Sequence, residues 1–204
     1  MEEDNPVLDV IISLVEGAKT RQKALKCDCD GENYTLWSCD YLLDQALRQY
    51  QIPESHYLIS KAASDLWAEL AKTQNIRNFH YKQKVTYEGD QPRQIDRYKG
   101  NSSVPCPEKL MLIPGKKFSY REVFHNEHVV PLKIIIKHLL LLDKPDYSSV
   151  SEILGHIYIC RILKKEDRKI KQKSNRPYNV SDVLQTTYKE AGIVIEDSSQ
   201  IVGR

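Results

Sequence analysis

The stretch Phe124-His125-Asn126-Glu127-His128-Val129-Val130-Pro131 decides how the rest of the chain is interpreted. It places a carboxylate, Glu127, directly before a histidine, His128, and then two β-branched residues and a proline. This order is typical of a strand that ends at a proline turn. A carboxylate can bind a divalent ion, and an imidazole can take a proton from a water beside it. The simpler alternative is a strand that runs into a turn, with His128 a hydrogen-bonded surface histidine.

Length and composition indicate a folded protein without a membrane segment. The chain has 204 residues, of which 41% are hydrophobic, enough for one good-sized domain or two small ones. Its longest apolar run, residues 139–142, is far below the ~20 residues that a membrane span needs. The acidic start, Met1-Glu2-Glu3-Asp4, is unlike a secretory signal. We therefore expect a cytoplasmic protein with no membrane partner.

The net charge of +2 is unevenly distributed along the chain. Residues 1–70 carry a net charge of −7, and residues 71–204 carry +9. The second segment has the sign expected of a protein surface that meets a polyanion. The first segment is expected to serve folding, assembly or regulation.

The five cysteines do not form a convincing zinc pattern. Cys27, Cys29 and Cys39 cluster, whereas Cys106 and Cys160 are isolated. Tetrahedral zinc sites generally use pairs of cysteines separated by two to four residues, which this chain lacks. We expect reduced thiols and no structural zinc.

Hydrophobic spacing divides the chain into a helical segment, residues 1–75, and a mixed segment, residues 76–204. In the first, helices are expected from Asn5, over Leu36–Tyr50, and from Pro53 through Leu70, so that residues 5–73 form a three-helix unit. The second changes character: its expected strands lie at residues 79–87, 94–98, 116–124 and 156–163, with an irregular loop over 99–115. Further helices are expected at residues 131–142, 150–154, from Lys164, and 180–191. The fold class is therefore α+β.

In chain order, residues 117–170 are expected to form a strand that ends in Glu-His-Val-Val-Pro, a helical insertion and a second strand. A helix with Glu166-Asp167 in its first turn follows. The segment resembles the HNH endonucleases, the ββα-metal superfamily, and in its tail (Arg176-Pro177 and residues 188–193) it is similar to restriction-type members. The resemblance covers roughly residues 80–195. It implies a ββα-metal nuclease core with a helical insertion, preceded by the helical unit, and a metal-dependent hydrolysis of DNA phosphodiester bonds.

The resemblance also implies residue roles. His128 would be the general base, and Glu127 and Asp167 would bind the metal, with Glu166 the alternative to Asp167. Mg²⁺ is the expected ion because the ligands are oxygens, and Mn²⁺ is the second choice. The partner is double-stranded DNA, and a homodimer would suit symmetric cutting of both strands. Cationic side chains after the second strand would contact phosphates; these are Lys164, Lys165, Arg168, Lys169, Lys171, Lys173 and Arg176.

Departures from the family pattern leave alternatives open. The commonest pattern has Asp where this chain has Glu127, and Ser151 or His156 would replace its middle Asn. Glu166 and Asp167 also suit a helix N-terminus for electrostatic reasons alone. His125 is expected to be structural or exposed, with a role near the phosphate as its alternative. The alternative function is a non-catalytic nucleic-acid-binding or regulatory protein on a degenerate nuclease scaffold.

Overall fold

A computed structural model describes residues 6–25, 34–76, 79, 82–98, 107–171 and 175–196, without the side chains of residues 21–25 and 34–40. Its helices and small separate sheets confirm the expected α+β class. Several residues singled out from the sequence lie outside this description. They are Asn5, Cys27, Cys29, Cys106, Lys173 and the side chain of Cys39.

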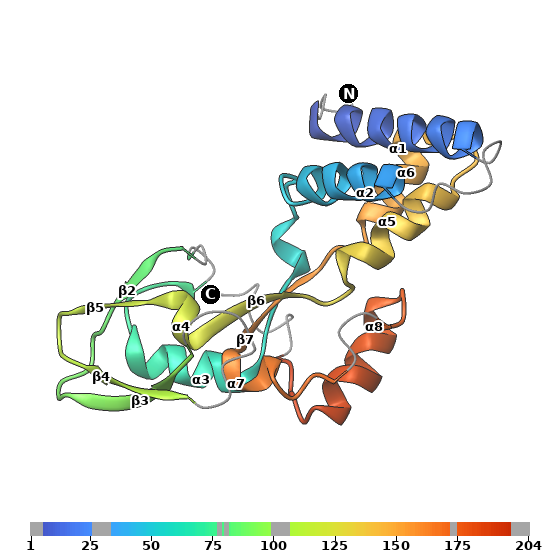
Figure 1. Ribbon diagram of the computed structural model, residues 1–204. Helices are drawn as coiled ribbons and strands as arrows, with labels where there is room; N and C mark the ends of the chain where they lie inside the picture. Colours follow the sequence, from blue (N-terminus) through green and yellow to red (C-terminus); the bar gives the residue numbers. More distant parts are fainter. Residues whose placement is uncertain are drawn as a thin grey trace.

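A three-stranded sheet lies at the middle of the molecule (Figure 1). Its order is β1 (Tyr57–Ile59), β7 (Ile159–Leu163) and β6 (Phe124–His128). The central strand β7 pairs parallel with β1 and antiparallel with β6, and all five of its residues are buried. A strand buried on both faces reads as a continuous apolar run, and Ile159-Cys160-Arg161-Ile162-Leu163 departs from that rule only at Arg161.

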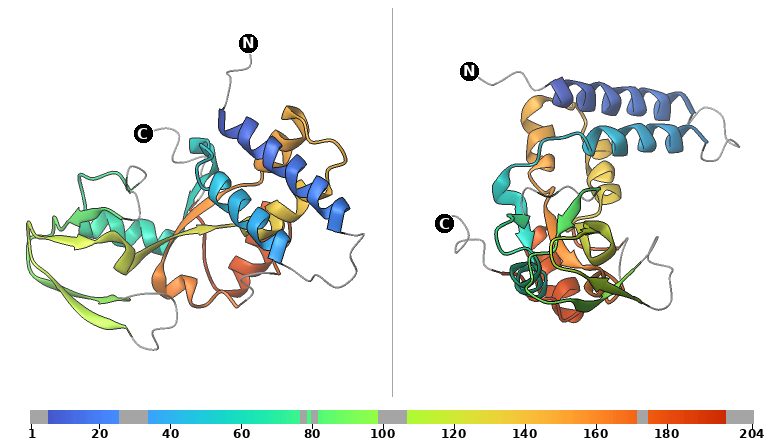
Figure 2. Two further views of the ribbon diagram at one scale, coloured as in Figure 1. Left: turned by 45° about the horizontal axis from the view of Figure 1, so that its top comes forward. Right: turned by 90° about the vertical axis from the view of Figure 1, so that its left-hand side faces the viewer.

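Four helices form a lobe at one end of this sheet (Figures 1 and 2). They are α1 (Pro6–Leu25), α2 (Tyr34–Leu47), α5 (Leu132–Leu141) and α6 (Tyr147–Leu154). Ile11 of α1, Leu43 of α2 and Ile135 of α5 are fully buried in one apolar cluster, which also includes Cys160 of β7. The first two helices therefore share their core with the middle of the chain.

A second lobe lies at the other end of the sheet (Figure 1). It contains α3 (Lys61–Leu70), α4 (Tyr120–Val123) and the two antiparallel pairs β2–β5 and β3–β4. The strands span Lys84–Thr86, Arg93–Arg97, Glu108–Leu112 and Lys117–Ser119, from β2 to β5. Its core is aromatic: Trp67 lies edge-on to Phe124 at 5.5 Å between ring centroids, and Tyr120 stacks on Phe124 at 5.1 Å.

The C-terminal part of the chain packs against one face of the central sheet. The short helix α7 (Lys164–Asp167) follows β7 directly. After it come α8 (Val180–Val183) and a π-helical turn, η3 (Leu184–Tyr188). Gly192 then has a φ of 67°, a left-handed conformation that ends the helical segment as its sequence predicts.

Three local predictions are wrong. The helix expected from Pro53 is instead the 3-10 turn η1 (Glu54–His56) and strand β1, and α3 begins only after Ser60, whose hydroxyl accepts a hydrogen bond from Ala63 N at 3.1 Å. The expected strand 116–124 is interrupted by α4, and the expected loop 99–115 contains β4. Three apolar residues in sequence do not distinguish a strand from part of a helix, which explains the first error.

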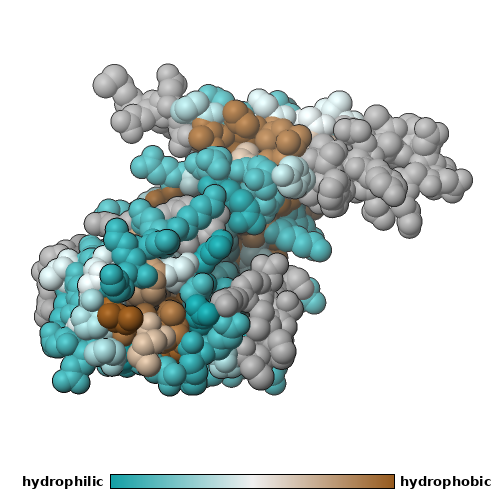
Figure 3. All heavy atoms as spheres, turned by 60° about the vertical axis from the view of Figure 1, so that its left-hand side comes forward, coloured by the Kyte–Doolittle hydropathy of each residue, from teal (hydrophilic) through white to brown (hydrophobic). Residues whose placement is uncertain are grey.

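Within the described residues, no helix is both long and apolar enough to cross a membrane. Figure 3 shows that the face of the second lobe is mostly hydrophilic around one apolar area, and that another apolar area lies on the helical lobe above it. Val10 of α1 is 51% exposed, and Met111 in β4 and Ile113 just after it are 54% and 50% exposed.

Candidate metal and phosphate site

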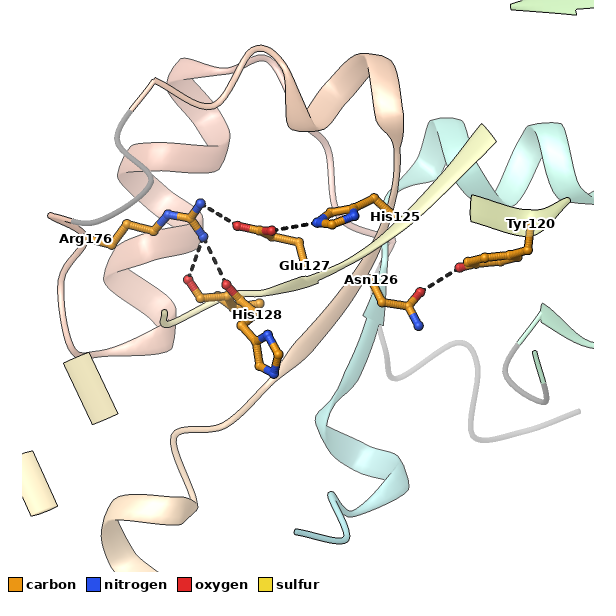
Figure 4. Close-up of polar contacts among 7 residues, drawn as sticks. Tyr120, His125, Asn126, Glu127, His128 and Arg176 are labelled. Atoms are coloured by element: carbon orange, nitrogen blue, oxygen red, sulfur yellow. Dashed lines mark hydrogen bonds and ion pairs between the residues drawn. The ribbon is translucent and has the colours of Figure 1, made fainter. Parts of the chain in front are cut away.

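Strand β6 presents its residues alternately to the two faces of the central sheet. Figure 4 shows His125 and Glu127 on one side of the strand, and Asn126 and His128 on the other. Asn126 accepts a hydrogen bond from the hydroxyl of Tyr120 at 2.7 Å. The strand continues through His128, so the adjacent pair from which the sequence argument started is divided between two faces.

On the first face, His125 and Glu127 meet Asp167 of α7. One potential ligand atom from each of the three lies within 4.8 Å of the other two. His125 Nε2 is 3.0 Å from Glu127 Oε2. Asp167 is 7% exposed, whereas the side chain of His125 is 38% exposed, so the cluster is buried on one side and open at the histidine.

Arg176 holds Glu127 in place from the opposite end of the cluster. Its guanidinium donates to Glu127 Oε1 at 2.5 Å, and to the carbonyl oxygens of His128 and Val129 at 3.0 and 3.1 Å (Figure 4). Burial acts to raise the pKa of Glu127, but the hydrogen bonds and charges of His125 and Arg176 outweigh it and lower that pKa to about 2. Glu127 is therefore a carboxylate throughout the physiological range.

The chemistry of this cluster suits a hard divalent cation. Mg²⁺ is generally bound through one or two carboxylates, with waters and substrate phosphates filling its other positions. Ligand atoms about 2.1 Å from one ion lie roughly 3 to 4.2 Å apart, so side-chain atoms within 4.8 Å of one another are close enough to converge on a single ion after side-chain adjustment. Glu127 and Asp167 supply the two carboxylates, and His125 supplies a nitrogen next to them.

His128, to which the sequence argument gave the role of general base, does not join this cluster. Burial and the charge of Arg48 lower its pKa to about 4, although Glu127 and Asp44 act in the opposite direction. A base with so low a pKa is weak near neutral pH. Its position on the other face of β6 gives no support to that role.

Glu166, the alternative to Asp167 as a ligand, is turned into the protein. Its Oε2 accepts from the hydroxyl of Ser60 at 2.6 Å and from the backbone N–H of Leu163 at 2.8 Å. Glu166 is 5% exposed and Ser60 is fully buried. The structure therefore brings Asp167, and not Glu166, to Glu127.

The predicted DNA-contacting cations fall into three groups. Lys165, Lys169 and Lys171 are exposed on the surface beside α7, and Lys173 is outside the described residues. Lys164 and Arg168 are partly buried there, with the Arg168 guanidinium 4.5 Å from the centre of the Tyr98 ring. Arg176 has a fully buried side chain bound to protein oxygens, which leaves it unavailable to a phosphate.

Arg121 of α4, which is not among the cations expected from the sequence to contact DNA, belongs to the same positive region. Desolvation lowers the pKa of Lys164, and the charges of Arg121 and Arg168 lower it further, against the opposing effects of Asp167 and Glu122. Arg121 and Arg168 therefore both lie close enough to Lys164 to act on its charge, and so does the Asp167 carboxylate. Such a concentration of positive charge is favourable for a bound phosphate.

A sequence signal for the observed cluster was present. His125 and Glu127 are separated by one residue, and that spacing places two side chains on the same face of a strand. Arg121 gave no such signal, because its approach to Lys164 depends on how α4 and α7 pack. No protein-family model, no curated protein and no solved structure matches this chain.

Proposed function

We propose that this protein is a metal-dependent endonuclease that hydrolyses phosphodiester bonds in double-stranded DNA. The observation that carries the proposal is the approach of His125, Glu127 and Asp167 within 4.8 Å of one another, where two antiparallel strands and a helix meet. The cations beside α7 add the complementary charge for a nucleic-acid backbone. The resemblance of residues 117–170 to the HNH endonucleases supports the same assignment.

The roles within the site follow from burial and charge. Glu127 and Asp167, the less exposed groups, hold the divalent ion, Mg²⁺ or Mn²⁺, which would stabilise negative charge on the reacting phosphate. His125 is the most exposed of the three and takes the proton of the attacking water, the role that the sequence argument gave to His128. Arg176 keeps Glu127 ionised and fixed in orientation.

Lys164, Arg168 and Arg121 would contact the phosphates next to the scissile bond. The charges of Asp167, Arg121 and Arg168 all act on Lys164, which supports positive charge near the edge of the metal cluster. Contacts of this kind bind the backbone without reading its sequence, so they set affinity and salt dependence and not the cutting site.

The test is plasmid cleavage with Mg²⁺ or Mn²⁺, together with Mn²⁺ affinity. We expect His125→Ala to slow cleavage by ~10²–10⁴-fold with little change in Mn²⁺ affinity, as for loss of a general base. Glu127→Gln should weaken Mn²⁺ binding, and His128→Gln should cut at nearly the wild-type rate. His138→Ala, which changes a histidine outside the cluster, is the matched control.

Three outcomes would contradict this proposal or its residue roles. Equal cleavage by wild type and His125→Ala would remove His125 from the reaction. If the wild type cleaves none of the duplexes tested when metal is added, the proposed endonuclease activity is wrong. If His128→Gln loses cleavage and His125→Ala does not, His128 is the general base, as expected from the sequence.

The Arg176–Glu127 ion pair favours a second candidate, a nucleic-acid-binding protein that does not cut. At 2.5 Å and with the arginine side chain fully buried, this pair already neutralises one proposed ligand. Such a protein would bind duplex DNA in EDTA, with an affinity that falls as salt rises, and would show no cleavage when Mg²⁺ is added.

A further inference from the structure

Tyr188 is fully buried, and its hydroxyl has no hydrogen-bond partner among the described residues. Buried polar groups in native proteins are nearly always satisfied, because a buried donor or acceptor without a hydrogen bond loses its hydration without compensation. A lone buried hydroxyl therefore suggests a partner that protein atoms alone do not supply. Tyr188 ends the π-helical turn η3, and such turns are found often at functional sites.

The position of Tyr188 is on the metal-cluster face of the central sheet. In the β6–β7 register Glu127 lies directly opposite Cys160, so both side chains point to the same face. Cys160 and Tyr188 belong to the same buried cluster. Tyr188 therefore belongs to the apolar cluster that packs on the face of the sheet carrying Glu127, and Arg176 reaches Glu127 from the segment just before α8.

The charges around the hydroxyl agree with this position. Burial raises the pKa of Tyr188 far above its ordinary value, and the negative charges of Glu127 and Asp167 act in the same direction, against the positive charge of Arg176. The phenol is therefore neutral at every physiological pH. It can donate a hydrogen bond, but it cannot serve as a base.

We propose that Tyr188 is a positioning residue that donates its hydroxyl hydrogen to a water held in the His125–Glu127–Asp167 cluster when a divalent ion is bound. The inference rests on the proposed metal site and deepens it. Glu127 and Asp167 provide only two of the positions that Mg²⁺ or Mn²⁺ requires, and waters normally fill the rest. A buried donor would fix one of these waters and raise the affinity for the ion.

The experiment compares the full-length wild type with Tyr188→Phe, which removes only the hydroxyl. Tyr178→Phe is the matched control, because Tyr178 lies on the same segment but stacks on His138 at 3.7 Å. The dissociation constant for Mn²⁺ is measured by counting free Mn²⁺ with electron paramagnetic resonance, and the thermal unfolding midpoint is measured in EDTA. Neither readout depends on cleavage.

We expect Tyr188→Phe to weaken Mn²⁺ binding about tenfold, the lower end of the range for residues that support metal ligands. Its unfolding midpoint in EDTA should equal or exceed that of the wild type, because no protein hydrogen bond is lost. Tyr178→Phe should bind Mn²⁺ as the wild type does.

Unchanged Mn²⁺ affinity in Tyr188→Phe would overturn this inference and leave the endonuclease proposal standing. A lower midpoint in EDTA with unchanged affinity would overturn it too, since the hydroxyl would then have a structural role. If the wild type binds Mn²⁺ no better than Glu127→Gln, the metal site itself is absent, and both proposals fail together.

Discussion

At the scale of single residues, the two histidines of strand β6 differ because a strand turns each successive side chain to the opposite face. His125 is on the face that carries Glu127 and Asp167, and His128 is on the face that lies near Arg48 and Asp44. Adjacency in sequence suggested one site for Glu127 and His128. The extended backbone through residue 128 separates them.

His128 should make the folded protein sensitive to acid. Its pKa is about 4 in the folded state and near 6.5 when unfolded, so the unfolded chain takes up a proton first as the pH falls. The stabilising contribution is complete above pH 6.5 and is lost as the pH falls towards 4. Between pH 7.5 and 5.0 we expect a loss of about 2 kcal/mol in the free energy of unfolding.

Urea unfolding of the wild type and of His128→Gln at both pH values measures this loss. The glutamine variant cannot be protonated, so its free energy of unfolding should fall by about 2 kcal/mol less than that of the wild type over the same interval. Parallel losses in the two proteins would show that other groups account for the acid sensitivity.

At the scale of elements, the two neighbouring acids of α7 perform different tasks. Glu166 joins α7 to strand β7 and to the start of α3 through Leu163 and Ser60, in a buried network. Asp167 is at the metal cluster. The sequence could not separate them, because both residues suit the first turn of a helix and their directions depend on a contact with residue 60, more than a hundred positions away.

The variants Glu166→Gln and Asp167→Asn should therefore behave in opposite ways. Glu166→Gln is expected to lose about 1.5–3 kcal/mol of stability, the range for a buried hydrogen bond to a charged group, and to bind Mn²⁺ normally. Asp167→Asn should lose Mn²⁺ affinity, because it removes one of the two proposed carboxylate ligands. Denaturant unfolding in EDTA and Mn²⁺ titration measure the two effects, and a reversed pattern would restore Glu166 as the ligand.

How much of the architecture could be predicted also depends on the range of the contacts. The apolar spacing of residues 132–141 and the β-branched run at 159–163 were sufficient for α5 and β7, since both signals are local. Strand β1 has only three residues, and its partner β7 lies about a hundred residues later. No local pattern contains that pairing, which is why it was missed.

At the scale of the whole molecule, the helical segment 1–75 does not form a separate hydrophobic core. Its helices α1 and α2 cover α5 and α6, while β1 and α3 contribute to the central sheet and the second lobe. Ile135 and Leu139 of α5 are fully buried in the cluster that includes Ile11 and Leu43. The change in composition near residue 75 therefore marks no division between the two apolar cores.

A fragment of residues 76–204 should fail to fold. It would expose the faces of α5 and α6 that α1 and α2 cover, and it would leave β7 without β1. Circular dichroism during heating is expected to show a cooperative transition for the full chain and none for the fragment. A cooperative transition in the fragment, with helix content matching its share of the full chain, would establish residues 76–204 as an independent domain.

The buried guanidinium of Arg176 also has a consequence for the order of synthesis. It joins positions 49 residues apart, and it fixes both a proposed ligand and the carbonyl groups at the end of β6. A nascent chain that has not yet been extended to residue 176 lacks this support, even though it already contains His125, Glu127 and Asp167. The ribosome would thus add the last residue of the His125–Glu127–Asp167 cluster nine residues before Arg176, so that a growing polypeptide could not acquire the finished geometry until Arg176 had been added.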